Sequence, residues 1–257
     1  MIWQAYRILP RIFNEIRKEL RYAIPSRRPR RILFDHIPKC AGSTLGKYLQ
    51  AHYPRRKTFA TDGRRPAESI ARFLDLPESR RHAFALIKGH QAGLLIDAVH
   101  PETLKITVLR EPVDRIVSHY YFAKRTQSHY LYDKIHRKKM SLKDYVEAEF
   151  SHELKNHYTL HFSGLSLKQA EADPDASIAL ALEKIRRFDL VGFQDDLSGF
   201  IESLRREGGL SRPIPKRKTN VTQNRKNVQD LDDATREMIV ASNALDLQLF
   251  QKVQNAT

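Results

Sequence analysis

Two short stretches of the sequence combine residues that bind phosphate. In the first, a lysine precedes small residues and hydroxyls, in the order His36-Ile37-Pro38-Lys39-Cys40-Ala41-Gly42-Ser43-Thr44-Leu45. Small residues at 41–43 let backbone N–H groups approach an anion, and a helix beginning there adds a favourable dipole. Lys39 supplies a charge, and Ser43 and Thr44 supply hydroxyl donors. The stretch predicts an anion site, although alone it fits an ordinary strand-to-helix turn with a solvated lysine equally well.

This stretch differs from the phosphate loop of ATP-binding enzymes, which has the form G-x-x-x-x-G-K-[ST]. Lys39 precedes Gly42, whereas the lysine of that loop follows a second glycine. The sequence therefore indicates a phosphate loop of a different kind.

The second stretch places an arginine and a serine eight residues apart, in Arg110-Glu111-Pro112-Val113-Asp114-Arg115-Ile116-Val117-Ser118-His119-Tyr120-Tyr121-Phe122. Arg110 is expected at the carboxyl end of a strand, where ligands of open α/β sheets bind. Ser118 is expected on the following helix, off its apolar face. A guanidinium and a hydroxyl so placed can hold a second phosphate. The alternative is that Arg110 pairs with Asp114 and that Ser118 is merely exposed.

Short apolar runs separated by helical patterns predict the elements that position these stretches. The expected strands are 31–37, 84–88, 105–110 and 190–193. The expected helices are 43–53, 113–121, 178–188, 197–204 and 231–253, and the expected loops are 26–30 and 210–227. The pattern predicts an α/β fold, a single domain in which helices flank a central parallel sheet and a P-loop-like strand-loop-helix binds phosphate.

Composition sets broad limits on function. The chain has 257 residues and one cysteine, Cys40, so it has no internal disulfide, and no group of cysteines and histidines has the spacing of a zinc site. The formal net charge is +15, with basic stretches at 7–31, 124–139 and 212–226. Such a field attracts nucleic acid, acidic lipid, acidic polysaccharide and anionic nucleotides alike.

The first thirty residues are predicted to form a basic helical segment, followed by one domain over 31–257. They contain no apolar run of signal or membrane-spanning length, so the protein is expected to be soluble and cytoplasmic. A basic amphipathic helix over 12–22 is also typical of peripheral contact with an anionic membrane, although such helices more often pack against their own domain.

Together, the two stretches resemble the sulfotransferases that use 3′-phosphoadenosine 5′-phosphosulfate (PAPS). That superfamily has a first loop of the form HIPKTAGT and a second of the form RDPxxRxxSxYY. Cys40 stands where threonine is common, and Glu111 stands where aspartate is common. The run LREPVDRIVSHYYF is similar to its counterpart in the heparan sulfate 2-O-sulfotransferase and uronyl sulfotransferase branch. The resemblance covers roughly 31–250.

The resemblance implies transfer of a sulfuryl group from PAPS to a hydroxyl, most consistent with a carbohydrate or glycoconjugate. It implies that the first loop holds the 5′-phosphosulfate and the second stretch holds the 3′-phosphate. A loop at Arg217-Lys218-Thr219 looks like the one that covers the nucleotide. The residues so assigned to the donor are Lys39, Cys40, Ala41, Gly42, Ser43, Thr44, Arg110, Ser118, Arg217 and Thr219.

Two residues are assigned to the chemistry. Lys39 is expected to stabilise the negative charge that grows on the departing phosphate oxygens. Lys88-Gly89-His90 looks like the segment that carries the family's catalytic histidine, so His90 is the expected general base, with His36 and His119 as rivals. This chemistry requires no metal.

Two other classes of protein stay open at this point. A P-loop kinase or NTPase would share the strand-loop-helix phosphate site, but it should show the second glycine and a magnesium-binding acid. A basic nucleic-acid-binding module would explain the charge, but the sequence has no known DNA- or RNA-binding motif, so no nucleic acid partner is expected. The basic stretch at 124–139 favours an anionic acceptor. The identity of the acceptor, the position sulfated and the oligomeric state are not predicted.

Overall fold

The computed structural model describes residues 2–24, 28–148, 150–212 and 227–256. The chain forms two compact units. The first consists of Met1–Ile37, Ala41–Val108 and Asp195–Asn220, and the second consists of Pro38–Cys40, Leu109–Gln194 and Val221–Thr257. Each unit is described by itself.

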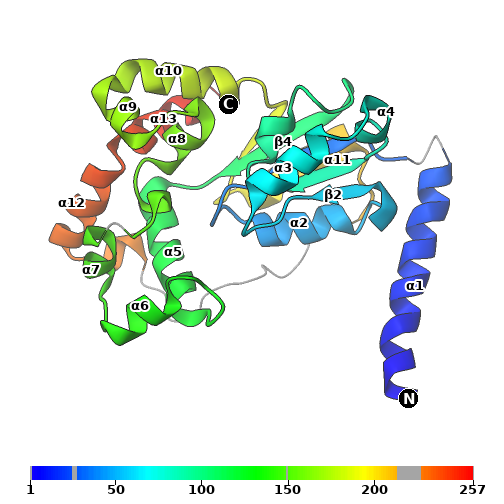
Figure 1. The fold of residues 1–257 in the computed structure, drawn as a ribbon, viewed down its shortest axis with the longest axis horizontal. Coiled ribbons are helices and arrows are strands. Elements are labelled where there is room, and N and C mark those ends of the chain that lie inside the picture. The colour runs from blue at the N-terminus through cyan, green and yellow to red at the C-terminus, as the bar shows by residue number, and fades with distance from the viewer. Residues whose placement is uncertain (1, 25–27, 149, 213–226, 257) are drawn as a thin grey trace. The chain divides into compact units, whose positions relative to one another are not determined.

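A central sheet organises the fold, with strand order β2-β3-β1-β4-β5 (Figure 1). The strands are β1 (Ile32–Asp35), β2 (Thr58–Ala60), β3 (Leu86–Gly89), β4 (Leu104–Leu109) and β5 (Leu190–Phe193). The pairings β2–β3, β1–β3 and β1–β4 are parallel. All four residues of β1 are buried, as is typical of a parallel strand covered on both faces. The predicted α/β class and central parallel sheet are confirmed.

In the first unit, helices and short 3₁₀ turns surround the strands. They are α1 (Ile2–Ala23), α2 (Gly42–Gln50), η2 (Arg55–Lys57), α3 (Pro66–Leu74), α4 (Glu78–Arg81), η3 (Ala92–Leu95) and α11 (Leu197–Gly208). Leu33 of β1, Leu45 and Leu49 of α2, and Leu204 of α11 are fully buried. Burial of these apolar side chains holds α2 against the sheet. This helix follows β1 in the chain, as predicted for the first stretch.

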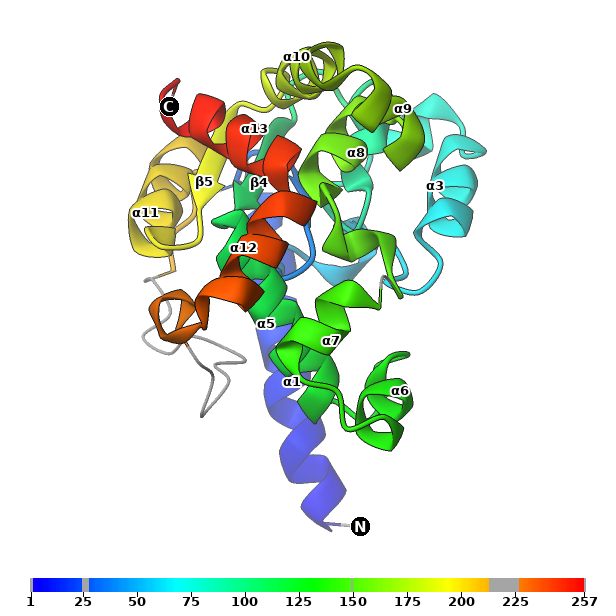
Figure 2. The ribbon, with the colours of Figure 1, turned by 90° about the vertical axis from the view of Figure 1, so that its left-hand side faces the viewer.

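The second unit is mostly helical. Its helices and turns are α5 (Pro112–Arg125), α6 (Tyr132–Arg137), α7 (Leu142–Glu147), η4 (His152–Leu154), α8 (His157–Ser163), α9 (Leu167–Ala172), α10 (Pro174–Ile185), η5 (Val228–Asp230), α12 (Asp233–Ser242) and α13 (Ala244–Gln254). Two views show α12 beside α5, and α8, α10 and α13 packed together (Figures 1 and 2).

The start and the packing of α5 follow from its sequence. The Glu111 carboxylate accepts hydrogen bonds from the N–H groups of Val113 (3.0 Å) and Asp114 (2.6 Å), and Pro112 occupies the first helical position. The predicted apolar face is buried in a cluster that includes Ile116, Val117, Tyr120, Ile135, Tyr145 and Ile239.

Three expectations about elements were wrong in their bounds. The helix predicted over 178–188 begins at Pro174, because Asp173 caps it by accepting from the Ala176 N–H at 3.1 Å. The helix predicted over 231–253 is two helices, which break at the buried Asn243. The strand predicted over 31–37 is shorter. Most of the loop predicted over 210–227 lies outside the described residues.

Candidate active site

The first phosphate-binding stretch has an uncommon backbone. Lys39 (φ 69°) and Ala41 (φ 57°) both adopt left-handed conformations, which cost a non-glycine residue on the order of 1 kcal/mol. Ala41 is the N-cap of α2 and makes no side-chain hydrogen bond to the helix. The N–H groups of Gly42 and Ser43, at the start of α2, therefore receive no hydrogen bond from a capping side chain, and they suit an anion instead.

A close contact with His36, which the sequence did not reveal, requires glycine at position 42. A Cβ built on Gly42 would lie 1.7 Å from the His36 imidazole. No side chain larger than hydrogen fits between that ring and α2. Gly42 therefore lets His36 lie over the first turn of the helix.

In the second unit, Lys39 and Arg110 lie together. The Arg110 Nε–H donates to Asp114 Oδ2 at 2.5 Å, and an Nη1–H donates to the Lys39 carbonyl at 3.2 Å. The Lys39 ammonium lies 3.5 Å from the centre of the Phe122 ring. Burial, together with the nearby charges of Arg125 and Arg110, lowers the pKa of Lys39 to about 7. This excess of positive charge would be relieved by a bound anion.

The alternative to a phosphate site in the second stretch was an Arg110–Asp114 pair with an exposed Ser118, and its two parts have different outcomes. The Arg110–Asp114 ion pair does form. Ser118, however, is only 8% exposed on α5, so the picture of a merely exposed serine is wrong.

Tyr158 joins the two stretches and was not predicted as a site residue. Its O–H donates to the Arg110 carbonyl (2.7 Å), and its oxygen accepts from the Arg110 N–H (3.1 Å). The Cys40 thiol lies 3.2 Å from the same oxygen. Burial raises the pKa of Cys40, so the thiol keeps its proton, which it donates to the Pro38 carbonyl at 3.6 Å. Tyr158 thus positions the backbone of both stretches, and a tyrosine distant in sequence carries no local signal of this role.

His119 is held by partners on both ring nitrogens. Its Nδ1 lies 2.7 Å from the Tyr145 hydroxyl, and its Nε2 lies 2.6 Å from Glu153 Oε2. Burial lowers the pKa of His119, so the ring is neutral, donates from Nε2 and accepts at Nδ1. Burial acts to raise the pKa of Glu153, but the hydrogen bond from His119 and the nearby positive charges, including that of Arg115, together outweigh it and hold the carboxylate ionised. His119 therefore has no nitrogen available to take a proton from a substrate.

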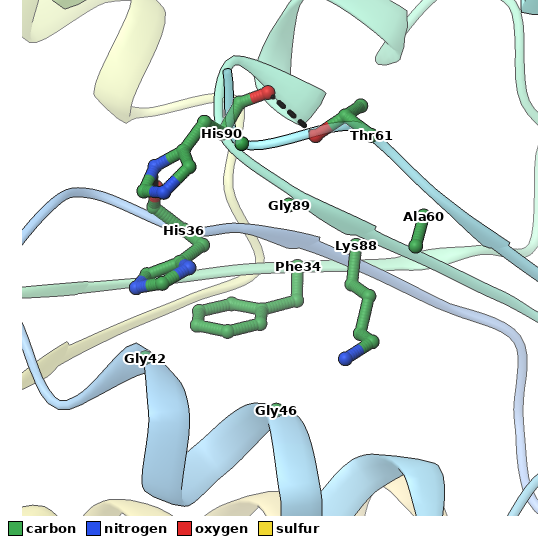
Figure 3. Close-up of a pocket in the computed structure, with 10 residues that line it drawn as sticks. Phe34, His36, Gly42, Gly46, Ala60, Thr61, Lys88, Gly89 and His90 are labelled. Atoms are coloured by element: carbon green, nitrogen blue, oxygen red, sulfur yellow. Dashed lines mark hydrogen bonds between the residues drawn. The ribbon is translucent and has the colours of Figure 1, made fainter. Parts of the chain in front are cut away.

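His90 lines a cavity of about 230 Å³ in the first unit (Figure 3). The lining residues are Phe34, His36, Gly42, Gly46, Ala60, Thr61, Gly63, Lys88, Gly89 and His90. The imidazoles of His36 and His90 stack with their centres 4.4 Å apart. The Thr61 hydroxyl donates to the His90 carbonyl at 2.9 Å. This approach requires Gly89 (φ 134°), because a Cβ there would lie 2.1 Å from Thr61 Oγ1.

The hydrogen bond of His90 fixes its tautomer. Nδ1 lies 2.8 Å from the His36 carbonyl oxygen, which only accepts, so Nδ1 carries the proton. In the neutral ring Nε2 then has the free lone pair. Within the described residues no hydrogen bond to Nε2 is found, and a Cβ on Gly63, also at the cavity wall, would lie 3.8 Å from it. His90 therefore has the form that a general base needs.

The remaining assigned residues divide between the units. Ala41, Gly42, Ser43 and Thr44 belong to the first unit, and Lys39, Cys40, Arg110 and Ser118 belong to the second. Arg217 and Thr219 lie outside the described residues. Lys88, to which the sequence analysis gave no role of its own, lines the same cavity as His90.

These residues fit the donor that the sequence resemblance implies. PAPS is anionic. In the second unit the buried Lys39 is a cation that suits a phosphate or sulfate group, and in the first unit the N–H groups at the start of α2 suit one as well. No group of three histidine, cysteine or acidic side chains suited to a metal ion occurs in the part of the chain that the structure describes.

Comparison with known proteins gives one family. The model of the sulfotransferase family matches residues 26–252, which is most of the chain. No curated protein matches the sequence. The chain therefore belongs to the sulfotransferase family and is an enzyme that transfers a sulfuryl group from PAPS to an acceptor hydroxyl.

Proposed function

We propose that the protein sulfates a hydroxyl of a carbohydrate or glycoconjugate, with His90 as the general base. The observation that carries this proposal is the tautomer of His90, whose Nδ1–H donates to the His36 carbonyl and leaves Nε2 able to accept a proton. The carbohydrate acceptor is favoured by the similarity of LREPVDRIVSHYYF to the heparan sulfate 2-O-sulfotransferase and uronyl sulfotransferase branch.

The donor is assigned to residues of both phosphate-binding stretches. The amides of 40–44 and the hydroxyls of Ser43 and Thr44 would hold the 5′-phosphosulfate. Arg110 and Ser118 would hold the 3′-phosphate, with Arg110 releasing or sharing its contact with Asp114. Arg217 and Thr219 are assigned to the nucleotide by the sequence resemblance alone.

When bound, PAPS supplies the sulfuryl group and a phosphate leaving group. His90 Nε2 takes the proton of the acceptor hydroxyl, and the hydrogen bond from Nδ1–H to the His36 carbonyl strengthens as the ring becomes cationic. Lys39 places its charge where negative charge grows on the leaving oxygens. These two side chains act on opposite ends of the transfer, as an in-line displacement requires.

The acceptor is tested by incubating the protein with PAPS labelled in its sulfuryl group and a panel of glycans, aryl glycosides and tyrosine peptides. The proposal predicts label on glycans or glycosides and none on the peptides. Label only on tyrosine peptides would reject the carbohydrate acceptor and leave the family assignment intact.

We also propose that the protein is cytoplasmic and contacts an anionic membrane surface through α1. None of the described helices is long and apolar enough to cross a bilayer. The two acidic side chains of α1 face its own unit, where Glu15 accepts from the Arg55 N–H and Glu19 pairs with Arg56 at 2.6 Å. Four apolar residues of the helix are instead 48% to 65% exposed: Ile12, Phe13, Ile16 and Leu20.

At 100° per residue these four side chains fall within an arc of about 100°. The exposed Arg11 and Arg17 add positive charge to the same helix. An apolar stripe with basic residues is the arrangement that binds anionic lipid, and burying each large apolar side chain contributes about 1.5–3 kcal/mol.

The membrane proposal is tested by sedimentation with vesicles of phosphatidylcholine, with and without phosphatidylglycerol. The protein should sediment only with the anionic vesicles, and Phe13→Asp with Leu20→Asp should abolish this. The matched control is Leu74→Asp with Val240→Asp, which alters exposed apolar residues elsewhere. Equal binding by both double variants, or none by the wild type, would reject it.

A further inference from the structure

The Lys88 side chain lines the cavity, and no acidic side chain of the cavity wall pairs with its ammonium group. It is paired in register with Phe34, and both side chains lie on the sheet face that looks toward α2 (Figure 3). No acidic residue lines the cavity. Within the described residues, the Lys88 side chain makes no hydrogen bond or ion pair. Burial lowers the pKa of Lys88, as expected for an ammonium that has lost water and gained no counter-charge.

The Lys88 ammonium approaches α2 at a glycine, Gly46, which has no side chain. Gly42 and Gly46 are four residues apart on α2, on one face, and both line the cavity. A Cβ on Gly46 would lie 3.4 Å from Lys88 Nζ. Glycine inside a helix is about 1 kcal/mol less favourable than alanine. Gly46 thus keeps space beside Lys88 at a cost in helix stability.

Lys88 and His90 line the same cavity from one segment of chain. β3 ends at Gly89 (φ 134°), so what relates the two side chains is the cavity that both line, and strand alternation does not apply to them. An acceptor whose hydroxyl reaches His90 would therefore present a neighbouring group to Lys88. A partly buried ammonium is favourable only when an anion compensates it.

We propose that Lys88 recognises an oxyanion on the acceptor, so that the enzyme prefers acceptors bearing a carboxylate or sulfate next to the reacting hydroxyl. This inference rests on the proposed role of the cavity in sulfuryl transfer. A charge-assisted hydrogen bond to such a group raises affinity by about 10- to 100-fold. Lys88 is thus a residue that determines specificity, distinct from the base.

Protection of the Lys88 amine from acetylation tests the inference without measuring activity. The full-length protein, saturated with adenosine 3′,5′-bisphosphate, is treated with a limiting acetylating reagent and analysed by peptide mass spectrometry. Glucuronate and glucose 6-sulfate should each slow acetylation of Lys88 relative to glucose. Lys47, exposed on α2, is the internal control and should react equally in all samples.

Each other outcome overturns the inference. If neither anion protects Lys88, it does not bind an acceptor oxyanion. If adenosine 3′,5′-bisphosphate alone gives the full protection, Lys88 serves the donor. Failure of that nucleotide to raise the melting temperature would instead reject the donor assignment, so the two failures are distinguishable. As a second measurement, Lys88→Met should lower the ratio of kcat/KM for aryl glucuronides over aryl glucosides by about 10- to 100-fold, and an unchanged ratio would also overturn it.

Discussion

Replacing Lys39 with methionine should abolish a pH dependence of nucleotide binding. The pKa of Lys39 is lowered to about 7 by burial and by the charges of Arg125 and Arg110. With that pKa, roughly ten in eleven molecules carry the ammonium at pH 6 and roughly one in eleven at pH 8. A bound phosphate favours the charged form and raises the pKa of Lys39, so binding takes up a proton. Affinity should therefore fall about tenfold for each pH unit above 7, until the pKa of the complex is reached.

Calorimetric titration with adenosine 3′,5′-bisphosphate, in buffers of different ionisation enthalpy, measures this proton uptake. The wild type should take up close to one proton near pH 8, and Lys39→Met should take up none. Titration of the nucleotide's own phosphate has the opposite sign below pH 7 and should persist in the variant. Lys47→Met, which changes an exposed lysine on α2, should behave as the wild type. Equal uptake by wild type and Lys39→Met would refute the reasoning.

Three further substitutions test separate parts of the site. His90→Ala should bind adenosine 3′,5′-bisphosphate as the wild type does but lose ~100- to 10,000-fold in kcat, and a selective kcat loss in His119→Ala instead would show that the wrong histidine is assigned. Tyr145→Phe leaves the buried His119 Nδ1 without its donor and should lower the free energy of unfolding by about 1–3 kcal/mol, measured in urea; an unchanged value would mean that the bond contributes nothing. Gly42→Ala forces a methyl group against the His36 ring and should destabilise the protein by about 1–3 kcal/mol, so an unaltered melting temperature would contradict the close approach.

The sequence predicted the elements whose signal is local. The strands β1, β3, β4 and β5 were placed within a few residues, because each is a short apolar run between polar boundaries. The start of α5 follows from Pro112 and the apolar spacing after it. β2 was missed because its three residues are too few to show a period.

Features that depend on distant residues were not predictable. The break between α12 and α13 occurs where the Asn243 amide donates to the Leu154 carbonyl and its side-chain oxygen accepts from the Asn156 N–H. Asp246, on α13, accepts from the Tyr158 and Thr159 N–H groups that begin α8. These contacts join positions almost ninety residues apart, so no window of sequence contains them.

The same distinction applies to the candidate site. The two stretches predicted to bind phosphate are each continuous in sequence, and their resemblance, taken together, to the family's two loops made them visible as candidates. The tautomer of His90 depends on its hydrogen bond to the His36 carbonyl. The neutral state of His119 depends on the hydrogen bonds that its two nitrogens make with Tyr145 and Glu153. The sequence resemblance named His90 as the expected base, and the hydrogen bonds that distinguish His90 from His119 could be described only from the structure.

The measurement that tests the central claim most directly compares thermal unfolding of the full-length protein with adenosine 3′,5′-bisphosphate and with ATP and magnesium. A ligand that binds only the folded state stabilises it by about 2.7 kcal/mol at a hundredfold excess over Kd. The account predicts that adenosine 3′,5′-bisphosphate raises the melting temperature, that ATP with magnesium does so far less, and that Arg110→Ala reduces the effect. No shift with millimolar adenosine 3′,5′-bisphosphate, or a larger shift with ATP and magnesium, would contradict the use of PAPS as the sulfuryl donor.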